Sequence, residues 1–467
     1  MADVFVAYSS VDREVAEKLV GLLSSQWSVW WDDLIVGDFD VAIEKEVLAA
    51  RCLVVLWSPE ARDSPEVKDE VRLASSAEIP IIAAKIRECT PPYGFQGISF
   101  SDLVGWDGQS EHKGVRQLLR RLSLAVPPQT PAPRPEHILE RRIPLPAIFL
   151  SVSSHETQLE PGAAVKALSL QQVPLVLVSA YDAVGARRSS EMLEALEEYR
   201  SNGGLVLVDS GNYEATRLRD TDWSPQDLGQ ALAEIPHDCV FCFDELAPER
   251  DVGKAIDQVV AAVKRDRAYS AAPVFPIVHA RPLRRGGFDR TALVQVVKGV
   301  SEALQPPLIA VPERELGAGL IERARTMLNI REGLSELPFY QPVHLLGTGN
   351  PWSIAVLAAA GADSFDGLEW CRVAVDHESG RLHHYQHFDF FRYQAQMSDS
   401  PVTREALKRR SVTFPAKVAF HNLDFYRRLS EKLLAAAAKG DFEALVVGML
   451  REANTRQLKQ KIPGLLA

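Results

Sequence analysis

A carboxylate in the first part of the chain lies where a parallel sheet would place a binding site. Residues 53–70 read LVVLWSPEARDSPEVKDE. Leu53–Trp57 is a short apolar run with β-branched residues, which is typical of a buried parallel strand, and Ser64-Pro65 is typical of a helix start. Because ligands of open α/β sheets bind at the carboxyl ends of the strands, Glu70 on the following helix can face a site there. The alternative is a solvated Glu on a charged helix face, which is the commoner case for any single Glu.

Polar side chains recur in the second part of the chain at the ends of apolar strand candidates. Asp209, Asp244 and Asp366 lie at the ends of three such runs, and His279 follows a fourth. The active sites of barrels built from parallel strands lie at the carboxyl ends of those strands. We therefore expect these four side chains to converge on one site, although buried Asp residues that cap strand-end loops are also common.

Two patterns suggest a metal site but have simpler explanations. Cys239 and Cys242 form a C-x-x-C pair inside CVFCFDE, which is typical of a buried strand, and no second pair lies nearby. His383, His384 and His387 form an H-H-x-x-H pattern, which favours a polar, histidine-rich strand over a ligand set. We expect no metal at either place.

The composition limits the classes of function. At 467 residues, with 46% apolar and 24% charged residues, the chain has room for two or three globular domains. The net charge of −10 argues against a nucleic-acid binder held by charge alone, although a local basic groove stays open. Charged residues interrupt the first apolar run, no run is long enough to span a bilayer, and the five cysteines are an odd number. We expect a cytoplasmic protein with reduced thiols and no membrane contact.

Residues 1–125 alternate between strand and helix patterns. This alternation predicts a small α/β domain with a doubly wound parallel sheet, covered by helices on both faces. Ser10 or Asp12 is expected to cap the first helix. The expected strands are Asp3–Tyr8, Ser28–Trp31, Leu53–Trp57, Ile79–Lys85 and a short one near Ile98–Leu103, and the expected helices cover residues 12–23, 41–50, a stretch from Pro65, and 113–124.

A proline-rich segment separates this domain from the rest. Residues 126–136, VPPQTPAPRPE, hold five prolines and predict a semi-rigid linker. In residues 137–467 eight apolar strand candidates alternate with helical patterns, which predicts a (β/α)8 TIM-type barrel with additional C-terminal helices. The candidates are Ala147–Val152, Leu175–Ser179, Gly204–Asp209, Cys239–Phe243, Val274–Val278, Leu308–Val311, His344–Leu346 and Ser364–Gly367.

Two stretches of residues 1–125 resemble a TIR domain throughout their length. They are DVFVAYSSVDREVAEKL and WSVWWDDLIVGDFDVAIEKEVLAARCLVVLWSPEARDSPEVKDE. The Tyr-Ser-Ser after the first strand, the W-x-V-W-W-D strand and the S-x5-S-x5-E run occur in that family's order. In the enzymatic branch of the family, a Glu that matches Glu70 is essential for cleaving the nicotinamide–ribose bond. One departure is Glu66, where many relatives have Trp.

The resemblance implies that the sheet is of the flavodoxin-like type, that NAD+ is a substrate and that TIR domains of several copies associate. Breaking an N-glycosidic bond builds positive charge on the ribose, which a nearby carboxylate stabilises, and nicotinamide leaves without protonation because it is already cationic. Two alternatives stay open, because Tyr8 and Trp31 can be packing residues at the sheet ends, and many TIR domains only scaffold other TIR domains. The residues expected to contact NAD+ are Tyr8, Ser9, Trp31, Asp38, Phe39 and Ser58.

Residues 137–467 resemble tRNA-guanine transglycosylases in several motifs. VDSGNYEA (208–215), VFCFDELAP (240–248) and HLLGTGNP followed by GADSFDGLEWCR (344–372) are similar to that family's D-S-G-G-[FY]-[QE], F-D-E-C-T-P, L-x-G-x-G-x-P and F-D-C-x-x-P-T-R motifs. By position, the resemblance implies a nucleophile at Asp366, a general base at Asp209, a base-stacking aromatic at Tyr213 and a guanine-edge acceptor at Asp244. Covalent base exchange needs one carboxylate to attack the ribose and another to handle the proton of the base. The expected ligand pocket comprises Asp209, Ser210, Tyr213, Asp244, His279 and Asp366.

The departures from that family fall on its base pocket and on its zinc site. Of the family's C-x-C-x-x-C and His zinc ligands only a match to His421 is present, and no cysteine follows Cys371, so we expect no zinc. The family's Q-G-G after the fifth strand reads His279-Ala280-Arg281, and the Gly-Gly at the pocket edge reads Pro312-Glu313.

Three functional hypotheses follow. The first is a TIR NAD+ glycohydrolase, switched on by a transglycosylase-like sensor domain that binds a nucleobase-like ligand or a nucleic acid, and serving anti-phage defence by analogy with other TIR fusions. The second is an active base-exchange enzyme on tRNA or DNA, with the TIR domain as an assembly module. The third is a scaffold with neither site active. We favour the first, on an argument that rests largely on analogy of fold.

Overall fold

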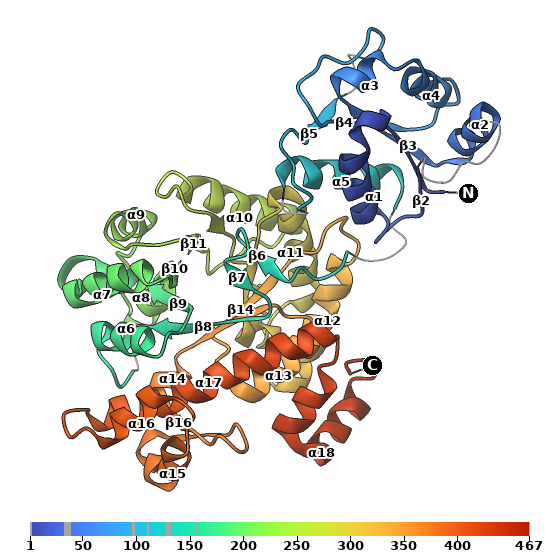
Figure 1. Cartoon of the computed structure of the whole chain (residues 1–467). Coiled ribbons are helices and arrows are strands. Elements are labelled where there is room, and N and C mark those ends of the chain that lie inside the picture. The colour runs from blue at the N-terminus through green and yellow to red at the C-terminus, as the bar shows by residue number, and fades with distance from the viewer. Residues whose placement is uncertain are drawn as a thin grey trace. The chain divides into compact units, whose positions relative to one another are not determined.

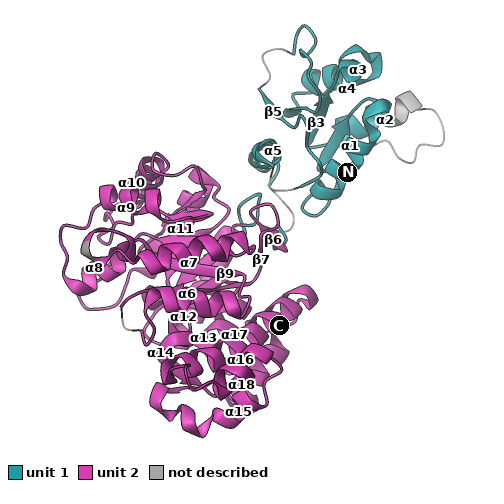
Figure 2. Cartoon of the chain, turned by 60° about the vertical axis from the view of Figure 1, so that its left-hand side comes forward, with its two compact units in different colours: residues 1–134, 335–340 teal, residues 135–334, 341–467 magenta. Residues whose placement is uncertain are grey.

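The protein is described by a computed structural model that covers residues 2–31, 39–95, 99–109, 112–127, 132–155 and 157–466, with the backbone alone for residues 39–42 and 186. Two compact units make up the chain (Figures 1 and 2). The first unit contains residues 1–134 and 335–340, and the second contains residues 135–334 and 341–467. The domain limits expected from the sequence stay a prediction.

The first unit contains a parallel sheet with the order β2-β1-β3-β4-β5. The short apolar runs of the sequence form its strands, because residues buried on both faces of a parallel sheet must be apolar throughout. The strands are β1 (Val4–Ala7), β2 (Val29–Trp30), β3 (Cys52–Trp57), β4 (Ile81–Lys85) and β5 (Phe100–Asp102). This strand order is that of a flavodoxin-like doubly wound fold.

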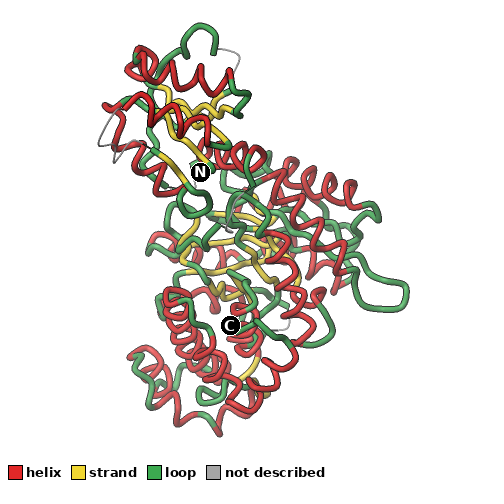
Figure 3. The backbone as a smooth tube through the Cα atoms, turned by 90° about the vertical axis from the view of Figure 1, so that its right-hand side faces the viewer, coloured by secondary structure: helices red, strands yellow, loops and turns green. Residues whose placement is uncertain are grey.

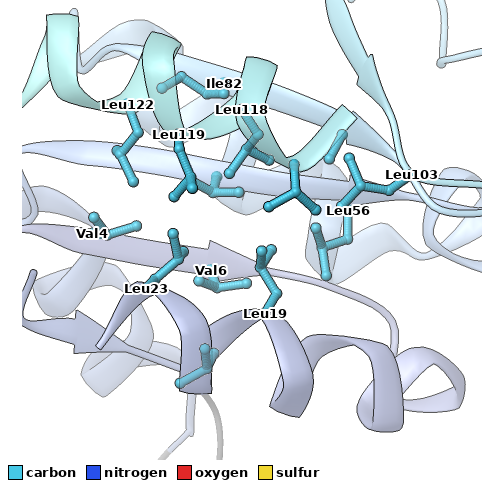
Figure 4. Close-up of a cluster of buried hydrophobic side chains, with 14 of the residues drawn as sticks. Val4, Val6, Leu19, Leu23, Leu56, Ile82, Leu103, Leu118, Leu119 and Leu122 are labelled. Atoms are coloured by element: carbon cyan, nitrogen blue, oxygen red, sulfur yellow. The ribbon is translucent and has the colours of Figure 1, made fainter. Parts of the chain in front are cut away.

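Helices cover both faces of this sheet. On one face α1 and α5 pack their leucines against alternate residues of β1, β3 and β4, as Figure 4 shows. On the other face α2 and α4 pack against the intervening residues of the same strands. The helical elements are η1 (Ser10–Asp12), α1 (Arg13–Leu23), α2 (Phe39–Ala49), α3 (Pro59–Asp63), α4 (Pro65–Ser76) and α5 (Lys113–Ala125).

The second unit contains a parallel barrel, in which Figure 3 shows the strands at the centre and helices around them. The strand order is β12-β11-β10-β9-β8-β15-β14-β13, and a parallel bridge between Ile277 and Ala310 joins the two ends. Side chains that alternate along the strands, such as Phe149, Leu177 and Phe241, form one buried cluster. The strands are β8 (Ala147–Val152), β9 (Leu175–Ser179), β10 (Leu205–Asp209), β11 (Cys239–Phe241), β12 (Val274–Phe275), β13 (Ile309–Pro312), β14 (Val343–Leu346) and β15 (Ser364–Gly367).

Helices between the strands surround the barrel. Two of them, α9 and α13, start at a capping side chain followed by a proline, Ser224 before Pro225 and Asn350 before Pro351, as helix starts favour. The elements are α6 (Pro161–Leu170), η2 (Ala180–Ala183), η3 (Gly185–Arg187), α7 (Ser190–Ser201), α8 (Asn212–Leu218), α9 (Pro225–Glu234), α10 (Val252–Asp266), α11 (Arg290–Leu304), η4 (Glu313–Leu316), α12 (Leu320–Leu334) and α13 (Pro351–Ala359). A small hairpin of β6 (His137–Ile138) and β7 (Ile143–Pro144) precedes the first barrel strand.

A mostly helical segment follows the last barrel strand. It comprises α14 (Glu369–Arg372), the hairpin of β16 (Val373–Val375) and β17 (Leu382–His384), η5 (Tyr385–Phe390), α15 (Arg392–Gln396), α16 (Pro401–Lys408), α17 (Phe414–Lys439) and α18 (Glu443–Lys461). The long helix α17 packs along this hairpin, α14 and α16. Across the described part of the chain, no helix combines the length and the apolar character needed to cross a membrane.

The predicted fold class is confirmed, because a doubly wound parallel sheet precedes a closed eight-stranded parallel barrel. The predicted helix start at Ser64-Pro65 is also confirmed, since the Ser64 side chain accepts a hydrogen bond from the amide of Val67. The predicted capping of the first helix is wrong, because neither N-cap residue there makes a side-chain cap bond. The short helix α3 was not expected.

Candidate functional site

A cavity of about 280 Å³ lies at the carboxyl ends of the barrel strands. The turn after β10 needs Gly211, which has a positive φ of 78° and leaves no room for a Cβ beside the backbone of Tyr181. This turn leads into α8 and carries the residues of the VDSGNYEA motif. The structure brings all six predicted pocket residues to the lining of this one cavity, and they are Asp209, Ser210, Tyr213, Asp244, His279 and Asp366.

Asp366, at the end of β15, is held by three donors. Ser151 Oγ lies 2.8 Å from Oδ2, the amide of Gly347 lies 2.8 Å from Oδ1, and His344 Nε2 lies 3.2 Å from Oδ1. His344 is fully buried beneath the cavity, and its other ring nitrogen lies 2.7 Å from Ser364 Oγ. Hydrogen bonds of this kind fix the direction of the carboxylate, as an attacking nucleophile requires.

Asp244 is engaged by neighbouring side chains on both of its oxygens. Ser210 Oγ lies 2.7 Å from Oδ1, and His279 Nε2 lies 2.7 Å from Oδ2. The second ring nitrogen of His279 lies 2.9 Å from Glu315 Oε1, and Glu315 also accepts the amide of Ala280 at 2.7 Å. The order is therefore Asp244–His279–Glu315, with His279 between two buried carboxylates.

The protonation of His279 and Asp244 follows from these contacts. Burial alone would lower the pKa of His279, but the hydrogen bonds and charges of Asp244 and Glu315 raise that pKa to about 10. Burial raises the pKa of Asp244, but the contacts with His279 and Ser210 outweigh it and lower the pKa overall. Near neutral pH His279 is thus an imidazolium that donates both of its N–H groups to carboxylates.

Two further acidic groups of the cavity hold their protons more strongly than usual. Burial raises the pKa of Asp209 well above its ordinary value, and the nearby carboxylates of Glu214, Asp244 and Asp366 raise it further. Burial likewise raises the pKa of Glu214, whose Oε1 lies 3.0 Å from Ser153 Oγ. The proton of Asp209 is therefore held more tightly than that of an exposed aspartate, and Asp209 can act as a base only after losing that proton.

The aromatic side chain expected to stack on a base lies at the mouth of the cavity. Tyr213 is 41% exposed, and the guanidinium carbons of Arg217 and Arg314 lie 5.9 and 5.6 Å from its ring centroid. A ring that is open to solvent and lines a cavity can take a flat ligand on its face.

The segment that matches the family's zinc site has a donor set that does not fit zinc. His421 stacks on His377 with ring centroids 4.0 Å apart, and its Nε2 lies 2.7 Å from the carbonyl oxygen of Val375. Burial lowers the pKa of both imidazoles, to about 4 for His377 and about 3 for His421. In the residues that the structure describes, no group of three or more His, Cys, Asp or Glu side chains is arranged to hold a metal ion. The hairpin β16–β17 is instead joined to α17 by hydrogen bonds of Asn422 to the backbone of Trp370, Val373 and Val375.

The two patterns that suggested metal ligands lie in ordinary structural positions. Cys239 and Cys242 are buried in the barrel, and burial raises the pKa of both thiols. His383 and His384 belong to β17, and the ring of His384 contacts that of His387 with centroids 5.9 Å apart.

In the first unit, Glu70 lies on α4 beside the buried stripe of Val67, Val71 and Ala74 and is half-buried. Tyr8 and Ser9, just beyond β1, and Trp31, just beyond β2, are also half-buried. The rings of Tyr8 and Trp31 lie together with centroids 6.0 Å apart. Asp38 lies outside the described residues, and so does the side chain of Phe39, whose backbone begins α2.

Ser58 is engaged in structure at the end of β3. It is fully buried, its hydroxyl donates to Asp12 Oδ2 at 2.5 Å, and it accepts the amide of Ala61 as the cap of α3. Asp12 also accepts from Arg87 Nη2 at 2.5 Å, and Arg87 pairs with Glu60 at 2.6 Å. These contacts explain why Asp12 does not cap the first helix.

The sequence reasoning missed several residues that build the barrel site. Ser151 and His344 are polar residues inside buried apolar strands, and that contrast is a signal that could have found them. Glu315 carried no such signal, because it lies in a short polar turn that meets His279 only after the barrel closes.

A closed parallel barrel with an acidic strand-end cavity, joined to a flavodoxin-like unit, defines a two-domain α/β protein with enzyme-like domains. The model of the queuine tRNA-ribosyltransferase family matches residues 148–455, more than half of the chain, so the chain belongs to that family. The TIR domain model matches residues 4–119, so a TIR domain is fused to the transglycosylase-like barrel.

Two curated relatives resemble the chain. The tRNA-guanine(15) transglycosylase of Methanopyrus kandleri is 26% identical over 246 residues, which are 49% of this chain and 49% of the relative. The tRNA-guanine(15) transglycosylase of Haloarcula marismortui is 22% identical over 235 residues, which are 50% of this chain and 47% of the relative. The chain thus spans about half the length of the curated relatives that it matches.

Proposed function

We propose that the protein is a TIR NAD+ nucleosidase that cleaves the nicotinamide–ribose bond, and that its barrel is a sensor that binds a nucleobase-like ligand or a nucleic acid. One observation carries the sensor assignment: a ligand-sized cavity retains Asp209, Tyr213 and Asp366, while the carboxylate expected to read the base edge is engaged by His279. NAD+ depletion by the activated enzyme would serve anti-phage defence in the cytoplasm.

The NADase assignment rests on Glu70 and on the TIR match. Loss of nicotinamide leaves an oxocarbenium-like ribose, and a carboxylate near it supplies the opposite charge. Glu70 is half-buried beside the apolar face of α4, where such a charge acts more strongly than on a fully exposed surface. Tyr8 and Trp31 would then contact the nicotinamide side of the substrate.

The test compares two isosteric variants of α4. Glu70→Gln is expected to abolish nicotinamide release from NAD+ by the activated protein. Glu66→Gln, one turn earlier on an exposed position, is expected to retain the parental rate. Nicotinamide is measured by chromatography, and hydrogen exchange of α4 confirms that both variants are folded. Parental activity of Glu70→Gln would remove the assignment.

The sensor assignment is tested at the mouth of the cavity. Tyr213→Ala is expected to abolish activation of the NADase by infected-cell lysate, because a stacked ligand loses about 1–3 kcal/mol with its aromatic partner. The control is Tyr393→Ala, which removes an exposed tyrosine of α15 that does not line the cavity. Equal activation of both variants would contradict a sensor at this site.

A second candidate function is base exchange by the barrel itself, with the TIR domain as an assembly module. The hydrogen bonds of Ser151, Gly347 and His344 to Asp366 favour it, because they prepare a carboxylate for attack on a ribose. Incubation of the protein with radiolabelled guanine and tRNA distinguishes the two functions. Exchange that Asp366→Asn abolishes would establish the second function and displace the sensor assignment.

A further inference from the structure

Two arginines from distant parts of the barrel sequence meet at one aromatic ring. Arg217 lies near the end of α8 and Arg314 lies in η4, and both guanidinium groups lie within 6 Å of the Tyr213 ring centroid, at 5.9 and 5.6 Å. Both arginines are exposed and line the cavity. Two cationic groups are therefore gathered at the entrance to the barrel site.

The positive charge of Arg314 is only weakly compensated. The ring quadrupole of Tyr213 attracts a guanidinium without neutralising its charge. The ion pair of Arg314 with Glu315 is long, at 3.9 Å, and the oxygen involved already accepts a hydrogen bond from His279 at 2.9 Å. The Arg314 side chain, 56% exposed, thus offers its donors to an incoming anion.

The interior of the cavity has a different character from its mouth. Inside the cavity, the single positive charge of His279 lies between two carboxylates, those of Asp244 and Glu315, and the carboxyl group of Asp366 lies nearby. This acidic interior offers acceptors to the hydrogen-bond donors of an uncharged ligand edge and disfavours an anionic group, whereas the mouth offers positive charge. A ligand that is neutral and flat at one end and anionic at the other matches this gradient.

We propose that Arg217 and Arg314 form a phosphate subsite at the mouth of the barrel cavity, so that the ligand is a nucleotide rather than a free base or nucleoside. This inference rests on the proposed function of the barrel as a binding domain. The volume of about 280 Å³ is at the small end of ligand pockets. It suits a heterocycle inside and leaves the phosphate outside, where planar guanidinium groups bind it with paired hydrogen bonds.

The phosphate belongs either to a free nucleotide or to a nucleic-acid chain, and both present the same group to the arginines. The test measures binding to the full chain by calorimetry for matched probes: guanosine and GMP, adenosine and AMP, and a short single-stranded oligonucleotide. Arg217→Gln and Arg314→Gln are compared with Arg219→Gln. Arg219 directly follows α8 and is exposed, but it does not line the cavity.

For at least one pair, the nucleotide is expected to bind roughly tenfold or more tightly than its nucleoside at about 50 mM salt, with a smaller ratio at about 300 mM. Arg314→Gln and Arg217→Gln are each expected to weaken nucleotide binding by about tenfold and to leave nucleoside binding within about twofold. Arg219→Gln is expected to bind both as the parental protein does. Tighter binding of the oligonucleotide than of the mononucleotide identifies a nucleic acid as the source of the phosphate.

The outcomes separate this inference from the function on which it rests. Equal affinity for nucleoside and nucleotide, or equal weakening of both by Arg314→Gln, would overturn the phosphate subsite and leave the binding cavity in place. No binding of any probe would overturn the proposed sensor function together with the subsite.

Discussion

Replacement of His279 by Ala tests whether the Asp244–His279–Glu315 chain is an ion triad. The two carboxylates are 7% and 4% exposed and lie 2.7 and 2.9 Å from the imidazole. Removing one partner of a buried ion pair costs about 3–5 kcal/mol, because the remaining charge stays buried without compensation. The raised pKa of His279 gives a similar figure. A rise from 6.5 to about 10 corresponds to roughly 4–5 kcal/mol of stabilisation of the charged imidazole, at 1.36 kcal/mol per pKa unit.

The sign of the pH dependence follows from the raised pKa. Because the folded-state pKa of His279 exceeds its unfolded value, its contribution is fully present below pH 6.5 and is lost as the pH rises through about 10. The stability difference between the parental protein and His279→Ala should therefore narrow across this window. Near pH 7 the melting temperature of the second unit should be lower in the variant by roughly 4–7 °C, given the entropy of unfolding of a unit of this size.

The assay is urea unfolding of the full chain at several pH values from about 6.5 to 10, with the two units read separately by hydrogen exchange. His237→Ala is the control, because the ring of His237 contacts Ser270 Oγ and the carbonyl of Ile235. Loss of these two hydrogen bonds should cost about 1–2 kcal/mol. A His279→Ala effect as small as that of the control, or one that stays constant from pH 6.5 to 10, would refute the ion triad.

Three further predictions concern other parts of the molecule. In urea unfolding, Arg87→Ala should lower the free energy of unfolding of the first unit by about 1–3 kcal/mol, because it leaves the buried Asp12 carboxylate without its cation. The control Arg72→Ala, which removes an exposed ion pair, should change this free energy by less than about 0.5 kcal/mol. A chelator should leave the melting temperature of the second unit unchanged, since the segment around His421 is held by hydrogen bonds and ring packing; a drop in calorimetry would reveal a structural metal. The ligand-free protein should be nearly inactive as an NADase, and light scattering should show self-association through TIR domains on activation; full activity of a strictly monomeric species would contradict this.

The strands were predictable because their signal is local. Apolar runs such as Leu175–Ser179 and Ala147–Val152 are buried along their whole length, so composition alone identifies them. That the strands form a doubly wound parallel sheet and a parallel barrel followed from their alternation with helices, but the order of the strands in the first sheet was not predicted. The cap of the first helix was not predictable, because Asp12 is drawn to Ser58 and Arg87, which lie 46 and 75 residues away.

The candidate site was predictable in its members but not in its connections. That Asp209, Asp244, His279 and Asp366 converge follows from their positions at strand ends. That His279 lies between Asp244 and Glu315 depends on contacts across 35 and 36 residues, for which the sequence holds no local signal. The expected contact of Ser58 with NAD+ was drawn from a motif, whereas its burial and its bond to Asp12 depend on the packing of the sheet end.

One residue separates the two functions proposed for the barrel. Attack on a ribose needs an oriented carboxylate. The carboxylate of Asp366 is oriented by the hydroxyl of Ser151, the amide of Gly347 and the ring of His344. Departure of a base needs groups that hold its edge and handle its proton. There Asp244 is already paired with the His279 imidazolium, and burial and the neighbouring carboxylates raise the pKa of Asp209 well above its ordinary value. The nucleophile is thus in place, but His279 occupies the carboxylate that would recognise the leaving base. A cavity in this state can hold a ligand without turning it over, which is the property that a sensor for the TIR domain requires.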